Sequence, residues 1–177
     1  MSMDYRQIWT VIHGTIFGLI FLLGSGGAIY ALASLRQDWQ TQQGLERNAR
    51  NIKIYLWILA VFVWAAVLTG TYIVYPWYRA TPPAGTYDLS AYPRYFLSSS
   101  AVTEGWHDFG MEWKEHVAFL APISVTVAAY AASYFGPRLA RCTQERRAIL
   151  IFCIVAFATA AVAGLLGALI TKVAPVQ

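Results

Sequence analysis

The sequence predicts an all-α integral membrane protein, a bundle of four transmembrane helices, from its composition and from four long uncharged stretches. Of the 177 residues, 58% are hydrophobic and 12% are charged, against roughly 25% charged in an ordinary soluble domain. Each stretch exceeds the roughly 20 residues that a helix needs to cross a hydrocarbon core. We therefore expect a single membrane domain over residues 1–177, with spans near 7–35, 53–78, 113–136 and 147–172.

The basic residues predict how the bundle is oriented. Eight of the 13 lysines and arginines fall in or beside the two short connections: Arg36, Arg47, Arg50, Lys53, Arg138, Arg141, Arg146 and Arg147. By the positive-inside rule this end faces the cytoplasm. We expect a bacterial inner-membrane protein with both termini and the 79–112 loop on the periplasmic side. The basic residues are interpreted as orientation anchors in the lipid bilayer, and no nucleic-acid partner is expected.

A long aromatic outer loop, residues 79–112, is expected between helices two and three. Pro76 indicates the end of helix two, because proline interrupts the hydrogen bonding of a helix. Thr103 and Glu104 are suited to begin a new helix, so helix three is expected to start in the outer space before its span at 113. The many aromatic residues of the loop fit either a belt at the lipid headgroups or a lid packed over the helix ends.

The three histidines all fall toward the outer face: His13, His107 and His116. An ionisable side chain inside a membrane helix is costly and points to a functional site. Helices one and three run in the same direction, so His13 and His116 are expected at comparable depth, as axial ligation of a haem by two histidines requires. His107 is about half a turn around the helix from His116, so the two are not expected to bind one ion.

The residues around these histidines fit a flat cofactor. Gly14 and Gly18 on helix one leave room either for a porphyrin or for a neighbouring helix, and both interpretations stay open. Arg79 and Arg94 in the outer loop are candidates to pair with haem propionates. Pro122 is expected to kink helix three close to His116. The small residues of helix four are explained by helix packing alone.

Four helices with His13 and His116 at one depth resemble the membrane-anchored b-type cytochrome subunits of respiratory electron-transfer complexes. The resemblance implies haem b held between helices one and three near the outer face. It also implies other membrane subunits as partners, with quinone or a periplasmic electron carrier as redox partner. The chain is then an electron-transfer or accessory subunit and not an independent enzyme, and it lacks the motifs of the common soluble enzyme classes.

Two alternatives remain open at this stage. Asp108, Glu112 and His116 are spaced four apart on one helix face and form a candidate non-haem metal site of carboxylates and imidazole, in which His107 is an alternative to His116. The same residues also fit a solvated acidic face. The second alternative is a cofactor-free accessory or assembly subunit of a larger membrane complex, whose small-residue stripes contact neighbouring subunits.

Overall fold

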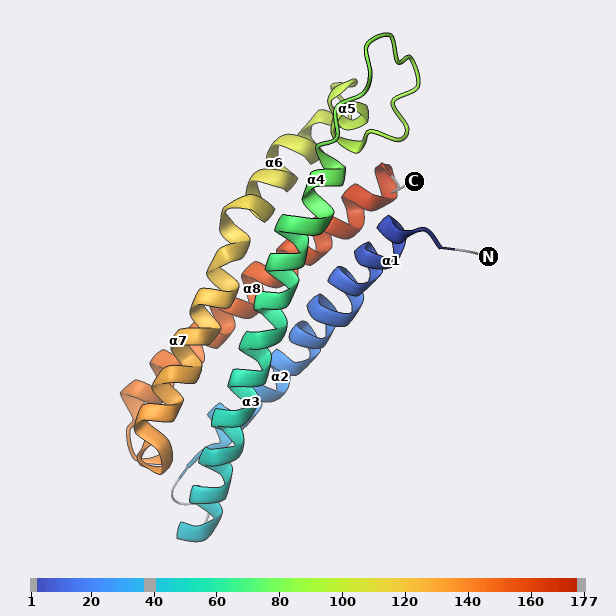
Figure 1. The fold of residues 1–177 in the computed structure, drawn as a ribbon. Coiled ribbons are helices and arrows are strands. Elements are labelled where there is room, and N and C mark those ends of the chain that lie inside the picture. The colour runs from blue at the N-terminus through green and yellow to red at the C-terminus, as the bar shows by residue number, and fades with distance from the viewer. Residues whose placement is uncertain (1–2, 37–40, 175–177) are drawn as a thin grey trace.

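Four long helices make up the bundle, which confirms the predicted fold class (Figure 1). The computed structural model describes residues 3–36 and 41–174, and these ranges hold helices and connections but no strand. The four helices long and apolar enough to cross a membrane, numbered one to four below, are Tyr5–Ser34, Gln42–Tyr78, Glu104–Ala140 and Thr143–Val173. Both termini and the long connection lie at one end, which we call the loop end (Figure 1).

Helices one to three are each built from several segments, whereas helix four is the single α-helix α8 (Thr143–Val173). The segments of helix one are α1 (Tyr5–Val11), a π-helix (Ile12–Leu19) and α2 (Ile20–Ser34). Those of helix two are α3 (Gln42–Thr69), a π-helix (Gly70–Val74) and α4 (Tyr75–Tyr78). Helix three joins α6 (Glu104–Glu115), a 3-10 turn (Val117–Phe119), α7 (Leu120–Phe135) and a 3-10 turn (Gly136–Ala140).

The helices are longer than the predicted spans, most of all at the start of helix two. This helix begins at Gln42 and not near residue 53, because the Thr41 hydroxyl caps it by accepting a hydrogen bond from the Gly44 N–H at 3.2 Å. The charged first turns of α3 precede the apolar stretch and belong to the same helix. The pattern of charges alone does not predict this extension. Helix three begins at Glu104, before its predicted span at 113, as Thr103 and Glu104 indicated.

The buried core lies mainly toward the short-connection end of the bundle. There α7 packs against both α3 and α8, and its small residues Ala128 and Ala129 are fully buried. Leu32 of α2 and Leu56 of α3 are likewise inaccessible. Close approach through small side chains is the usual way in which helices associate in lipid, where the hydrophobic effect does not drive them together.

Arg146 does more than orient the chain. Its Nη1 donates hydrogen bonds to the carbonyl oxygens of Leu35 at 2.7 Å, Ala140 at 2.9 Å and Leu139 at 3.5 Å. These carbonyls lie at the ends of helices one and three, where helical partners are missing. One of the predicted orientation anchors therefore also ties the two helix ends to α8.

Gly24 is a point of close approach between helices one and two. Its carbonyl oxygen accepts a hydrogen bond from the Tyr55 hydroxyl at 2.9 Å. A Cβ at Gly24 would lie 2.6 Å from the Cδ2 of Leu59, which is buried, whereas a Cβ at Gly26 would meet nothing within 4 Å.

We expect Gly24→Val to lower the free energy of unfolding by about 1–3 kcal/mol, because a side chain is forced into a packed contact. The matched variant Gly26→Val changes the same helix in open space and is expected to have a much smaller effect. Thermal unfolding of the two variants in detergent measures the difference. Equal losses of stability would contradict the close packing of Gly24.

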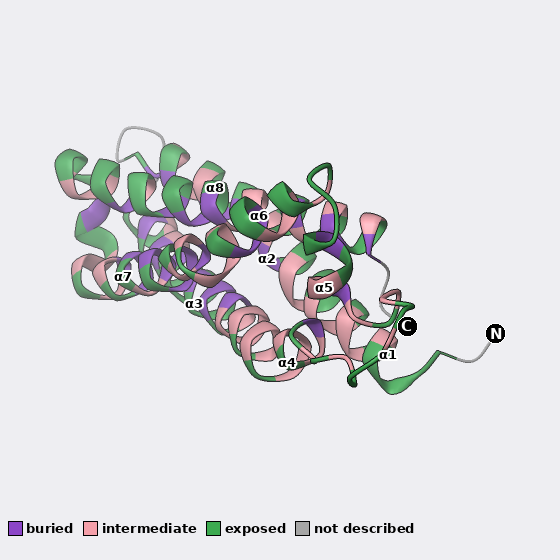
Figure 2. Ribbon diagram, turned by 90° about the horizontal axis from the view of Figure 1, so that it is seen from above, coloured by how far each residue is buried: buried purple, intermediate pink, exposed green. Residues whose placement is uncertain are grey.

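The loop between helices two and three folds partly back onto the bundle (Figure 2 looks onto this end). Its helix α5 (Pro93–Ser98) buries Leu97 in a second cluster with Tyr78, Met111 and Ile170. The Thr103 hydroxyl holds this turn by donating to the Leu97 carbonyl at 2.7 Å. The predicted outer loop 79–112 thus includes the first turns of α6, which begins at Glu104, and its α5 segment packs against the helix ends.

Candidate functional site

A cavity of about 840 Å³ lies in the loop-end half of the bundle and is lined by residues from all four transmembrane helices. It arises because α6 packs mainly on α8 in this half, whereas α7 packs on both α3 and α8 at the other end. The residues that matter for its chemistry are His13, Gly14, Gly18, Lys114 and His116.

Three helices depart from α-helical geometry where they border this cavity. His13, Gly14 and Gly18 lie in the π-helix of helix one, and a second π-helix begins at Gly70 of helix two. Such π-helical segments occur frequently at functional sites. In helix three, α6 ends at Glu115 and a 3-10 turn follows His116, because Pro122 has no N–H for the carbonyl four residues earlier. The expected distortion beside His116 is therefore present.

His13 is held against helix two by two contacts. Its Nδ1 lies 3.3 Å from the Thr69 Oγ1, and the Thr69 hydroxyl itself donates to the Ala65 carbonyl at 2.7 Å. The Thr69 oxygen must then accept from His13, which places the imidazole proton on Nδ1 and leaves the lone pair on Nε2. The ring also packs directly on Gly70, where an added Cβ would lie 2.7 Å from Cε1.

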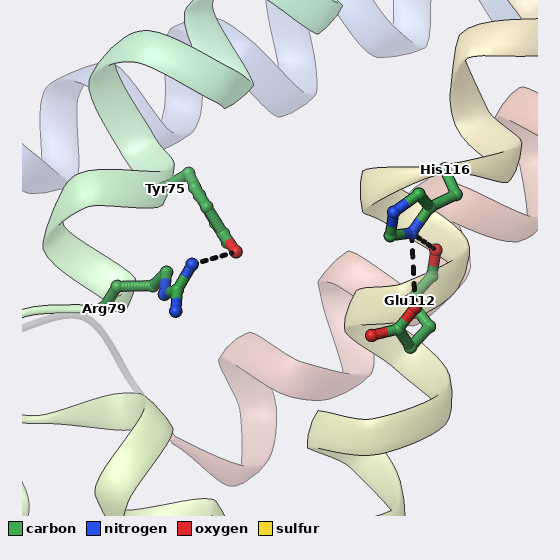
Figure 3. A network of polar contacts seen from close by, with 4 residues as sticks. All are labelled: Tyr75, Arg79, Glu112 and His116. Carbon is green, nitrogen blue, oxygen red and sulfur yellow. Dashed lines mark hydrogen bonds and ion pairs between the residues drawn. The ribbon is translucent and has the colours of Figure 1, made fainter.

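His116 is oriented by Glu112, one helical turn earlier (Figure 3). Its Nδ1 lies 3.2 Å from the Glu112 backbone carbonyl oxygen and 3.2 Å from the carboxylate Oε2. Both oxygens only accept, so Nδ1 carries the proton and Nε2 again keeps its lone pair. A carboxylate on the second ring nitrogen is the usual outer partner of a metal-binding histidine. The side chain of His116 is 70% exposed.

His13 and His116 thus line one cavity, and in both rings the hydrogen bond described above is made by Nδ1. The structure brings together the two histidines predicted from the sequence. Thr69 and Gly70 were not predicted, because only the fold brings them next to His13.

His107 and its neighbours do not join this pair. The His107 Nδ1 lies 2.8 Å from the Tyr78 hydroxyl, and His107 is absent from the cavity lining. Among the described residues no group of three or more His, Cys, Asp or Glu is placed to hold a metal ion. The alternative non-haem site of His107, Asp108 and Glu112 therefore gains no support, and Glu112 instead orients His116.

Arg79 and Arg94, the predicted partners for propionates, do not line the cavity. The Arg79 Nη1 donates to the Tyr75 hydroxyl at 3.2 Å (Figure 3), and its guanidinium lies 5.5 Å from the centre of that ring. Arg94 lies 6.0 Å from the centre of the Tyr95 ring. Arginine stacks readily on aromatic faces, and these contacts direct both side chains elsewhere. The cations that do line the cavity are Arg6 and Lys114.

Gly14 and Gly18 of helix one border open space. A Cβ at Gly14 would meet nothing within 4 Å, and one at Gly18 would contact only a backbone oxygen of its own helix at 3.5 Å. Both line the cavity, as do Gly164 and Gly167 of helix four. Helix packing alone therefore does not account for the small residues of helix four, because part of that stripe forms the cavity wall.

Comparison of the chain with protein-family models, with curated proteins and with solved structures finds no match.

Proposed function

We propose that this protein binds haem b in the loop-end cavity, between His13 and His116, and serves as an electron-transfer subunit of a larger membrane complex. The observation that carries the proposal is the pair of imidazoles on one cavity, each with Nδ1 engaged and Nε2 available. Neutral imidazole nitrogens are the usual axial ligands of haem iron in electron-transfer proteins.

The residues of the cavity fit such a group. Its volume of about 840 Å³ lies within the range of roughly 300–1,000 Å³ common for ligand sites. Gly14 and Gly18 leave one wall without side chains, and Arg6 and Lys114 supply positive charge for acidic substituents. The site is also mostly apolar, as expected for a haem that exchanges electrons within a bilayer.

Bound haem would supply one-electron exchange, and the residues of this chain determine which chemistry is open to it. His13 and His116 would both hold the iron, so the group would supply electron transfer and not reactions that need a free coordination position. Thr69 and Glu112 fix the two rings through Nδ1 and thereby keep both Nε2 atoms directed for ligation.

The distribution of charge supports an orientation for this subunit. The basic residues of the short-connection end favour a cytoplasmic location for that end. In this proposed orientation the cavity would lie near the outer face of a bacterial inner membrane. Electron exchange with quinone from the bilayer or with a periplasmic carrier is compatible with this position. Other membrane subunits would cover the apolar surface that the four helices leave exposed.

The test is an absorption spectrum of the purified protein, expressed with ample haem supply, before and after reduction by dithionite. We expect a Soret band and, on reduction, the sharp α and β bands of a haem with two histidine ligands. A colourless protein would overturn the proposal and favour the cofactor-free accessory subunit.

A further inference from the structure

Lys114 is a cation directed into the bundle at the wall of the loop-end cavity. It belongs to α6, and its Nζ lies close to helix four, since a Cβ added at Gly167 would be only 3.1 Å away. It is also near enough to His13 to interact electrostatically with that imidazole. The side chain thus spans from helix three toward helix four, on the cavity that holds the histidine pair.

Among the described residues, no carboxylate pairs with this ammonium group. Within the described part of the chain, no ion pair or hydrogen bond involves Lys114, although Glu112 and Glu115 are close in sequence. Glu112 is bound to His116, and Glu115 interacts with the hydroxyl of Tyr75 on helix two. A lysine near a helix end usually extends its ammonium to the water at the membrane surface. Lys114 instead packs against a glycine inside the bundle.

An unpaired charge inside a membrane bundle is costly, and such residues usually face a partner or a ligand. Removing the partner of a buried charge leaves that charge uncompensated. The absence of a side chain at Gly167 gives the ammonium group its room. The unpaired charge of Lys114 is costly, and it lies on the wall of a cavity large enough for a ligand. This position indicates that the ligand supplies the missing anion.

We propose that Lys114 is the anion anchor of the cavity and pairs with a carboxylate of the bound ligand, which for haem is a propionate. This inference rests on the proposed function and assigns to Lys114 the role that the sequence suggested for Arg79 and Arg94. The pairing fixes the rotation of the macrocycle about the axis through the two histidines. Charge-assisted hydrogen bonds of this kind are among the stronger ones in proteins.

The experiment compares haem with its dimethyl ester, in which both propionates are neutral. The full-length protein, freed of haem in detergent, is titrated with each compound and followed by the Soret absorbance. We expect wild type to bind haem about tenfold or more tightly than the ester. In Lys114→Met the ratio is expected to fall to the smaller part that Arg6 alone supports, whereas Lys114→Arg retains much of the wild-type ratio.

Lys172→Met is the matched control. Lys172 is the basic residue of the last turn of α8, it is exposed, and it does not line the cavity. Its removal changes the net charge equally, so the ratio of haem to ester affinity is expected to stay at the wild-type value. If Lys114→Met binds haem and keeps the full ratio, the anchor is wrong while the proposed haem site stands. If wild type binds neither compound, the proposed function itself fails.

Thermal unfolding supplies a second measurement that does not depend on the spectrum. Without haem, Lys114→Met is expected to unfold at a higher temperature than wild type, because the variant lacks an unpaired charge. With saturating haem, the rise in unfolding temperature is expected to be smaller in the variant than in wild type. A variant less stable than wild type without haem would contradict the unpaired state of Lys114.

Discussion

Replacement of His13 or His116 by alanine is expected to remove the haem or to leave it with one axial ligand. Loss even of an outer partner of a metal-binding histidine typically weakens binding about 10- to 100-fold, and loss of the ligand itself costs more. We expect purified His13→Ala to contain little haem. His116→Ala should behave in the same way, or retain haem with the broad spectrum of a five-coordinate iron. The measurement is haem per chain, together with the absorption spectra of the oxidised and reduced forms.

His107→Ala is the control for this prediction. His107 contacts Tyr78 at the loop end and does not line the cavity, so its removal is expected to leave the haem content and the reduced spectrum unchanged. Addition of imidazole to His13→Ala is expected to restore part of the low-spin spectrum, because the lost ligand is replaced in the cavity. Full haem content with an unchanged spectrum in both His13→Ala and His116→Ala would rule out ligation by this pair.

The sequence predicted the four membrane-length helices, and both predicted histidines, His13 and His116, line one cavity. Uninterrupted apolar stretches identify membrane spans, because a helix in lipid satisfies its own backbone and tolerates almost no charge. Helices one and three then run in the same direction, and His13 and His116 fall near one level. Pro122 likewise predicted the interruption beside His116, since the loss of an N–H is a local property of the chain.

The sequence was not sufficient for the partners of these histidines. Thr69 and Gly70 lie far from His13 in the chain and meet it only because α3 crosses the π-helix of helix one. The rotation of each helix about its axis sets such contacts, and rotation follows from packing and not from hydropathy. The π-helices themselves had no signal beyond the presence of Gly14, Gly18 and Gly70.

Lys114 shows why the position of a basic residue in a loop does not predict which cation lines the cavity. Arg79 and Arg94 were chosen because they follow the helix end and precede α6, yet both lie against tyrosines of their own segment. Lys114, by contrast, resembles an ordinary interfacial lysine in sequence, with acidic residues nearby. Only its approach to Gly167, together with the missing carboxylate, distinguishes it from a lysine that reaches the water.

Gly14→Leu is expected to block the cavity without damage to the fold. Gly14 lines the cavity, and a Cβ added there meets nothing within 4 Å, so we expect the leucine side chain to enter the space that the haem needs. Accommodating an extra side chain in a filled site costs about 1–3 kcal/mol. Haem binding must bear this cost in the variant, so its dissociation constant should rise by about tenfold or more.

Gly26→Leu on the same helix separates this effect from a general one. A Cβ at Gly26 also meets nothing within 4 Å, but Gly26 does not line the cavity. Both substitutions replace glycine in a helix and should make the haem-free protein no less stable, since glycine disfavours helices by about 1 kcal/mol. Only Gly14→Leu should lose haem affinity in a titration followed at the Soret band. Equal affinity in both variants would mean that the haem does not lie against helix one, and an equal loss in both would point to a change in the helix and not in the cavity.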